Sequence, residues 1–323
     1  MYFGKSGPFG ELLKIRNKPF ELVYFSIEAL EKYYSDPKYL VFYGDYRGSI
    51  CLDDRYTSDL NSNDELVKNF GLAYQKNNHG YRAVVLFAND LLAMPLKQQC
   101  YWFSYLLEDQ ENYYPNKGFV QNLILGEWID DISIFQALTM EIHYINLMCD
   151  AIGIPHMFKK EYPSDGRLQN ERPSNYHTIL LPTAERYYNF VITLEKMTTG
   201  NIDIRCFQTR VPTILTVDRK DKKGQCKGSV AMLCDWFSTN VIDVDVDILL
   251  KKPLKTLTKT RQIPAHEIYD NKYDKSVWKQ QDELMQEVYT AIRNIRLLLA
   301  NHPKTKGVKV PKILFDGDHI LTY

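Results

Sequence analysis

The sequence predicts an α+β protein in which a mixed α/β region precedes a mainly helical bundle. Short apolar runs bounded by turn residues prevail before residue 125, and apolar residues recur at three- and four-residue steps after residue 127. A chain of 323 residues is long enough for two domains. Because residues 159–175 are rich in proline and charge, we expect one domain at 1–158 and another at 176–323.

Apolar runs in the N-terminal region predict strands. The segment YLVFYGDYRGSICL (39–52) contains two such runs joined by GDYRG, which is typical of a hairpin. YRAVVLF (81–87) indicates a buried strand. Between them, the polar segment NDELVKNFGLAYQK (63–76) predicts a helix, and Pro95 predicts the start of another.

From residue 127 to 152 the pattern becomes that of one long helix, which Gly153 and Pro155 end. Its apolar positions share one face: Ile132, Phe135, Thr139, Ile142, Ile145, Cys149 and Ile152. After a further helix at 182–199 and short strand-like segments at 202–208 and 212–218, we expect a bundle over about 229–302. The last helix of this bundle carries a second apolar stripe: Leu284, Val288, Ile292, Ile295 and Leu299.

Composition and motifs exclude several classes of protein. The 40 basic and 40 acidic residues balance, which argues against a basic field over the whole molecule and leaves room for a local patch. Dinucleotide-binding, P-loop, zincin and α/β-hydrolase motifs are absent from the sequence, so we expect no cofactor and no metal. The six cysteines form no C-x-x-C pair, and no signal peptide or membrane span is recognisable, so we expect a soluble, cytoplasmic protein.

Two groups of charged residues have a functional and a structural interpretation. Asp45 and Arg47 could recognise a small ligand in an N-terminal sensor, although such residues are more often solvated turn positions. Glu127, Asp130 and Asp131 resemble a carboxylate cluster for a metal. The simpler explanation is that negative charge stabilises a helix N-terminus by about 0.3–1 kcal/mol per group.

Tyr101 and Trp102 are an aromatic pair on one expected helix. Aromatic faces can stack on the bases of single-stranded nucleic acid. An amphipathic helix that packs these rings inward is the favoured interpretation.

The hexamer RQIPAH, from Arg261 to His266, is the strongest candidate for a site. Arginine donates a fork of hydrogen bonds to a phosphate, and histidine exchanges protons near neutral pH. Cleavage of a phosphodiester by its neighbouring 2′-hydroxyl requires proton transfer and stabilisation of the phosphate charge. Because Pro264 disfavours helical geometry at Ile263, we expect Arg261 to end one helix and His266 to begin the next element, where their side chains converge.

Lysines precede this hexamer and extend its basic character. Lys252, Lys255 and Lys259 belong to a basic stripe that could hold a nucleic-acid backbone. The structural alternative is a helix C-terminus with favourable cations and a capping histidine. The sequence leaves both interpretations open.

An arginine followed after four to six residues by a histidine, within a helical bundle, resembles the HEPN superfamily. In this sequence Arg261 and His266 match the spacing, and Arg296 to His302 form a second match. The blocks YRGSI (46–50) and IRLLLANHP (295–303) also look like those of a bacterial protein family.

The HEPN resemblance implies a metal-independent endoribonuclease that acts in bacterial stress or antiphage defence. His266 would be the general acid or base, Arg261 would stabilise the phosphate oxyanion, and Lys252, Lys255 and Lys259 would position RNA. Arg296 and His302 are secondary candidates. HEPN proteins commonly form homodimers with a composite cleft, so we expect a homodimer, with the N-terminal domain available for a protein partner. The alternative is a non-catalytic dimerisation or partner-binding module of a bacterial defence or regulatory complex.

Overall fold

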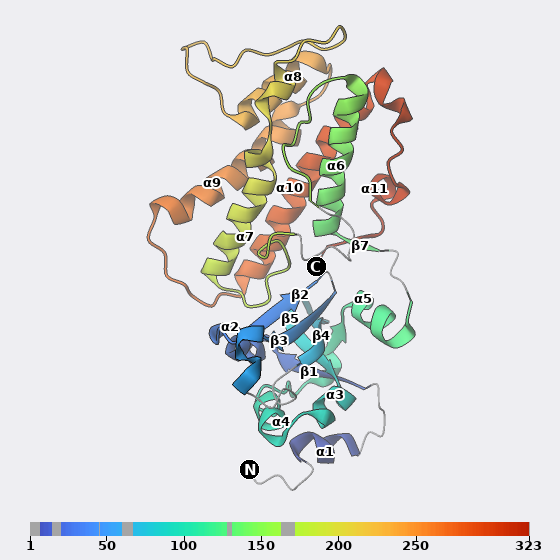
Figure 1. Cartoon of the computed structure of the whole chain (residues 1–323), viewed down its shortest axis with the longest axis vertical. Helices are drawn as coiled ribbons and strands as arrows, with labels where there is room; N and C mark the ends of the chain where they lie inside the picture. Colours follow the sequence, from blue (N-terminus) through green and yellow to red (C-terminus); the bar gives the residue numbers. More distant parts are fainter. Residues whose placement is uncertain are drawn as a thin grey trace. The chain divides into compact units, whose positions relative to one another are not determined.

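The computed structural model describes residues 7–14, 21–44, 46–59, 67–127, 131–162 and 172–322, and it confirms the α+β class. The chain forms two compact units (Figure 1). The first comprises residues 1–130 and 178–182, and the second comprises residues 131–177 and 183–323. An antiparallel sheet characterises the first unit, and helices dominate the second.

The sheet of the first unit has the strand order β1-β5-β4-β3-β2, and β6 pairs with β4 beside β3. Its strands are β1 (Leu22–Ser26), β2 (Tyr39–Tyr43), β3 (Arg47–Leu52), β4 (Val67–Gln75), β5 (Asn78–Phe87) and β6 (Tyr113–Pro115). The β2–β3 hairpin expected at 39–52 is confirmed, although Asp45 of its turn lies outside the described residues. The expected strand at 81–87 is confirmed as part of β5.

The helix expected at 63–76 was a wrong prediction, because the described part of this segment is strand β4. It pairs with β3 on one side and with β5 on the other. Five successive residues, from Phe70 to Tyr74, are buried. Covering of both faces of the strand removes the alternation of polar and apolar residues that identifies a half-exposed strand.

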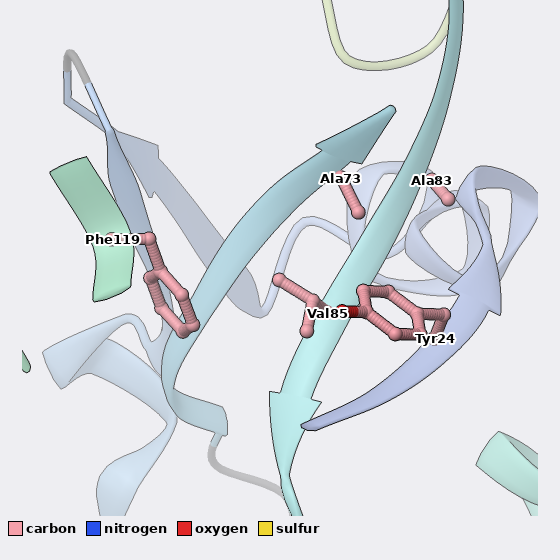
Figure 2. Close-up of a cluster of buried hydrophobic side chains, with 5 residues drawn as sticks. All are labelled: Tyr24, Ala73, Ala83, Val85 and Phe119. Atoms are coloured by element: carbon pink, nitrogen blue, oxygen red, sulfur yellow. The ribbon is translucent and has the colours of Figure 1, made fainter. Parts of the chain in front are cut away.

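The core of the first unit includes a cluster on the β1–β5–β4 part of the sheet (Figure 2). The cluster consists of Tyr24, Ala73, Ala83, Val85 and Phe119. The Phe119 ring covers Gly71 so closely that a Cβ at this position would lie 2.5 Å from the ring. Glycine is therefore required for this contact between strand and helix.

Helices of the first unit pack their aromatic residues inward. They are α1 (Gly7–Lys14), η1 (Ile27–Leu30), α2 (Glu31–Ser35), η2 (Asp54–Asp59), α3 (Ala88–Ala93), α4 (Leu96–Phe103), η3 (Gln110–Asn112), α5 (Lys117–Val120) and the π-helical η4 (Gln121–Leu125). The start of α4 after Pro95 confirms the prediction. Trp102 is fully buried and donates to the Tyr33 hydroxyl at 3.1 Å, while Tyr101 donates to the Ala29 carbonyl at 2.8 Å. These contacts favour the structural interpretation of the aromatic pair.

The second unit is built around α6 (Ile134–Ile152) and α10 (Ser276–Ala300), which pack against each other (Figure 1). Its other elements are β7 (Ile132–Ser133), α7 (Ala184–Met197), η6 (Thr199–Asn201), η7 (Ile204–Phe207), α8 (Ser229–Asn240), η8 (Asp247–Lys251), α9 (Lys252–His266), η9 (Pro303–Gly307), α11 (Lys312–Asp316) and β8 (Ile320–Leu321). All five residues of the predicted α10 stripe are buried, which confirms that stripe.

The extent of the long helix and the type of one element differ from expectation in the second unit. The long helix, which we expected within 1–158, belongs to the second unit because its apolar face packs against α10. It begins at Ile134. Ser133 caps this start, because its hydroxyl accepts a hydrogen bond from the Gln136 N–H at 3.1 Å. Within the segment expected as strand at 202–208, the structure forms the 3₁₀ helix η7, and the Asp203 side chain caps its first turn.

Residues 178–182 return from the second unit's stretch of sequence to the first unit. The buried Arg82 of β5 donates from Nη1 to the Ile179 carbonyl at 3.0 Å. The first unit is therefore assembled from two separate pieces of the chain. Among the helices that the structure describes, none is both long and apolar enough to cross a membrane.

Candidate nucleic-acid interface

Helix α9 carries the lysines and the hexamer that the sequence singled out. Pro253 lies in its first turn, directly after the π-helical η8. Leu254 and Leu257 are fully buried, and the helix packs against α7 and α10. The apolar side of α9 therefore fixes which side faces solvent.

The helix does not break at Pro264, contrary to prediction. Helix α9 continues through Pro264 and ends at His266. Proline removes one backbone hydrogen bond here, but the Glu267 N–H donates to the Ile263 carbonyl at 2.8 Å and closes the last turn. Arg261 and His266 therefore belong to one helix.

The lysines of α9 share one exposed face with His266. Steps of three, four, three and four residues connect Lys252, Lys255, Lys259, Gln262 and His266, and all five are exposed. Because residues three or four apart are neighbours on a helix, these side chains form one continuous line. We call Lys252, Lys255 and Lys259 the α9 lysine face.

Arg261 lies on the other side of the helix. It continues the series Leu250, Leu254 and Leu257 at steps of four, three and four, and it is half-buried. A helix turns about 100° and rises about 1.5 Å per residue, so Arg261 and His266 point about 140° apart with a rise of about 7.5 Å. The two side chains do not converge within one chain.

The α9 lysine face has no neutralising carboxylates on its own helix. Between Ile248 and His266 the sequence contains no Asp or Glu. Among the described residues, none of the three lysines forms an ion pair, whereas Lys251 binds Asp247 at 2.8 Å. On the neighbouring α8, burial raises the pKa of the Cys234 thiol to about 11; Lys251 and Lys255 oppose this rise, whereas Asp247 and Asp235 add to it.

Arg296 of the second match is inaccessible to a substrate. It is fully buried and forms a two-pronged ion pair with the buried Glu141 of α6, in which its Nη2 lies 3.1 Å from Oε1. The same nitrogen donates to the Leu314 carbonyl at 3.0 Å, and the guanidinium lies 5.3 Å from the centre of the Phe315 ring. Burial raises the pKa of Glu141, while Arg296 acts in the opposite direction.

His302 occupies a helix N-cap. Its Nδ1 accepts a hydrogen bond from the Lys304 N–H at 3.3 Å, and its Nε2 lies 2.9 Å from the Thr213 hydroxyl. Burial and the neighbouring Lys304 lower the pKa of His302. Arg296 and His302 thus have structural partners, and the structure does not bring them together with the α9 lysine face.

The N-terminal candidates are scattered or outside the described residues. Asp45 and Asp130 lie outside the described residues, Arg47 is exposed at the start of β3, and Glu127 is exposed. Asp131 lies 2.8 Å from His319. In the described parts of the chain, no group of three His, Cys, Asp or Glu side chains has the arrangement of a metal site.

A hollow of about 650 Å³ lies beside α8. Its charged lining consists of Lys220, Lys222, Lys227, Asp218, Asp221 and Asp235. Lys227 binds Asp235 at 2.7 Å, so positive and negative charges balance there. This balance contrasts with the α9 lysine face, where one sign prevails.

No family model, curated protein or solved structure matches the chain. The assignment of a function to this site therefore rests on the geometry of this chain alone. Sequence reasoning missed two features: the alignment of His266 with the lysines, and Glu141 as the partner of Arg296. The first could have been found from the three-and-four spacing, and the second had no signal because 155 residues separate the partners.

Proposed function

We propose that the second unit binds the phosphate backbone of RNA through the α9 lysine face. The observation that carries this proposal is the single exposed line of Lys252, Lys255, Lys259 and His266 on a helix segment without carboxylates. Lysines that neutralise phosphates release condensed counterions, so the affinity would fall steeply with salt.

We further propose that His266 cleaves the bound RNA as general acid or base, in the manner of the HEPN superfamily. His266 is exposed at the end of the lysine face and thus accessible to a phosphodiester. Arg261 points to the leucine side, so within one chain we assign Lys259, two turns before His266, to a neighbouring phosphate of the same RNA backbone. The proposed setting, by analogy with that superfamily, is bacterial stress or antiphage defence.

Binding can be tested with a labelled single-stranded RNA at increasing salt concentration. The variant K252Q/K255Q/K259Q should bind more weakly, and its slope of log affinity against log salt should be shallower by about 2. The matched control, K272Q/K279Q/K312Q, removes the same charge from lysines that already pair with Asp270, Glu283 and Asp316. Equal slopes for all three proteins would contradict binding through α9.

Cleavage needs a separate experiment, because binding and catalysis can fail independently. Wild-type protein with a chelator should cut mixed RNA and spare DNA of the same sequence, because DNA lacks the attacking hydroxyl. His266→Ala should abolish cutting and retain binding. If both proteins cut equally, or neither cuts, His266 is not catalytic.

The second candidate function is a non-catalytic dimerisation or partner-binding module. The observation that favours it is the divergence of Arg261 and His266 on a continuous helix. Under this function, wild-type protein leaves RNA intact, and His266→Ala changes assembly instead. Molar mass in solution and a melting curve for both proteins distinguish the two functions.

A further inference from the structure

Strand β2 is an edge of the sheet in the first unit. Its hydrogen bonds to β3 involve even-numbered positions, because the Gly44 N–H donates to the Arg47 carbonyl and the Asp53 N–H donates to the Lys38 carbonyl, each at 2.8 Å. In an antiparallel pair the bonded positions alternate. Val41 therefore directs its N–H and C=O away from β3, where no described residue binds them.

The edge of β2 lacks the features that normally prevent strands from pairing. The five residues Tyr39–Tyr43 include no charge and no proline, and the pairing with β3 has no bulge. Leu40 and Phe42 are 38% and 48% exposed on one face of the strand. An uncharged edge with exposed apolar side chains is a template for another strand.

We propose that β2 pairs antiparallel with β2 of a second copy of this chain, about a two-fold axis at Val41. In this register Val41 lies opposite Val41 of the partner, and the two exchange both backbone hydrogen bonds. Tyr39 lies opposite the partner's Tyr43, and Leu40 lies opposite the partner's Phe42. The strand YLVFY can thus pair with a second copy of itself that runs in the opposite direction.

The orientation of the backbone selects this register. Odd-numbered residues carry the outward groups, so odd positions must face odd positions, and a shift by one residue would put outward groups opposite inward ones. Of the remaining registers, the one centred on Val41 pairs all five residues and places Leu against Phe on the exposed face. Cross-strand pairs of this kind stabilise a sheet.

A second copy is the favoured partner because, about Val41, each residue of β2 faces one of similar character: Tyr faces Tyr, Leu faces Phe and Val faces Val. A symmetric interface brings each charge near its axis close to the same charge of the partner. Strand β2 has no charge to repel its copy. This interface lies in the first unit and does not depend on RNA binding or on His266.

The test is the molar mass of the full chain by sedimentation velocity. Wild-type protein should form a dimer at about 100 µM and dissociate on dilution, with a dissociation constant on the order of micromolar. Val41→Pro should raise this constant at least about tenfold, because proline removes the central donors of the interface. The N–H of Val41 does not bind β3, so the strand can accept proline at this edge position. Val41→Thr, which keeps the N–H, is the matched control and should dimerise like wild type.

A charge exchange tests the register. Leu40→Glu and Phe42→Lys should each be monomeric, because a charge then faces an apolar side chain. Mixing the two variants should restore a dimer, in which the introduced carboxylate faces the introduced ammonium. Circular dichroism checks that each variant is folded, and the mixing experiment decides the matter if Val41→Pro does not fold. A monomeric wild type, an unchanged dimer of Val41→Pro, or a mixture that stays monomeric would overturn the proposal.

Discussion

The two arginine–histidine matches have similar spacing and opposite environments. Arg296 is fully buried between Glu141, the Leu314 carbonyl and the Phe315 ring, whereas Arg261 is half-buried and has no partner among the described residues. The difference teaches that the spacing selects residues without indicating their role. Packing of the neighbouring helices decides whether the guanidinium is available to a ligand.

The histidines of the two matches differ in the same way. His302 caps η9 and lies beside Thr213, while His266 is the exposed last residue of α9. We therefore expect substitutions at Arg296 and His302 to change stability, and we expect substitution of Arg261, which has no described partner, to change it little. Three predictions test this distinction.

The largest effect is expected for Arg296→Ala. Its removal leaves the buried carboxylate of Glu141 without its counter-charge, which costs about 3–5 kcal/mol in the free energy of unfolding. Urea unfolding followed by circular dichroism measures the loss. The double variant E141M/R296M should recover most of it, because an apolar pair leaves no charge buried. A loss below about 1 kcal/mol for Arg296→Ala would show that the pair does not hold α6 to α10.

A smaller effect is expected for His302, and it depends on pH. The folded pKa lies below the usual 6.5, so the unfolded chain binds the proton more tightly. Stabilisation by the neutral imidazole is thus complete above pH 6.5 and is lost as the pH falls through the lower folded pKa.

The variant His302→Gln should therefore show a weaker fall in melting temperature than wild type between about pH 7 and pH 5. At the upper pH it should lose about 0.5–1.5 kcal/mol, because the hydrogen bond to Thr213 and the cap of η9 are impaired. Parallel pH profiles of the two proteins would contradict the burial of a neutral histidine.

The smallest effect is expected for Arg261→Ala. Its stability should remain within about 0.5 kcal/mol of wild type, because the guanidinium lacks a described partner. Its salt slope for RNA should equal that of wild type, since the side chain points away from the α9 lysine face. Lys259→Ala is the matched control on that face and should reduce the slope by about 0.7. A larger reduction for Arg261→Ala than for Lys259→Ala would reverse the assignment of the phosphate-binding side.

The sequence predicted elements whose signal is local. The stripe from Leu284 to Leu299 follows from helical periodicity, and the β2–β3 hairpin follows from alternation and a turn. Strand β4 escaped prediction because its neighbours bury both of its faces. The buried pair of Glu141 and Arg296 escaped it because contacts between distant helices leave no periodic signal.

The sequence predicted which residues form the candidate site but not how these residues are arranged on α9. Lys252, Lys255, Lys259 and His266 were identified as residues, but the expected break at Pro264 concealed their common face. The single lost hydrogen bond falls in the last turn of α9, so the helix tolerates it. A proline close to a helix end is therefore a weaker stop signal than the same residue in the middle.

The return of residues 178–182 to the first unit has a consequence for synthesis on the ribosome. The Ile179 carbonyl that binds Arg82 emerges about fifty residues after the end of the first unit's main segment. At a rate of about 5–20 residues per second, residues 178–182 are synthesised about 2–10 seconds after the rest of the first unit. During that interval α6 is already available for folding, so the two units must mature as overlapping events on the nascent chain.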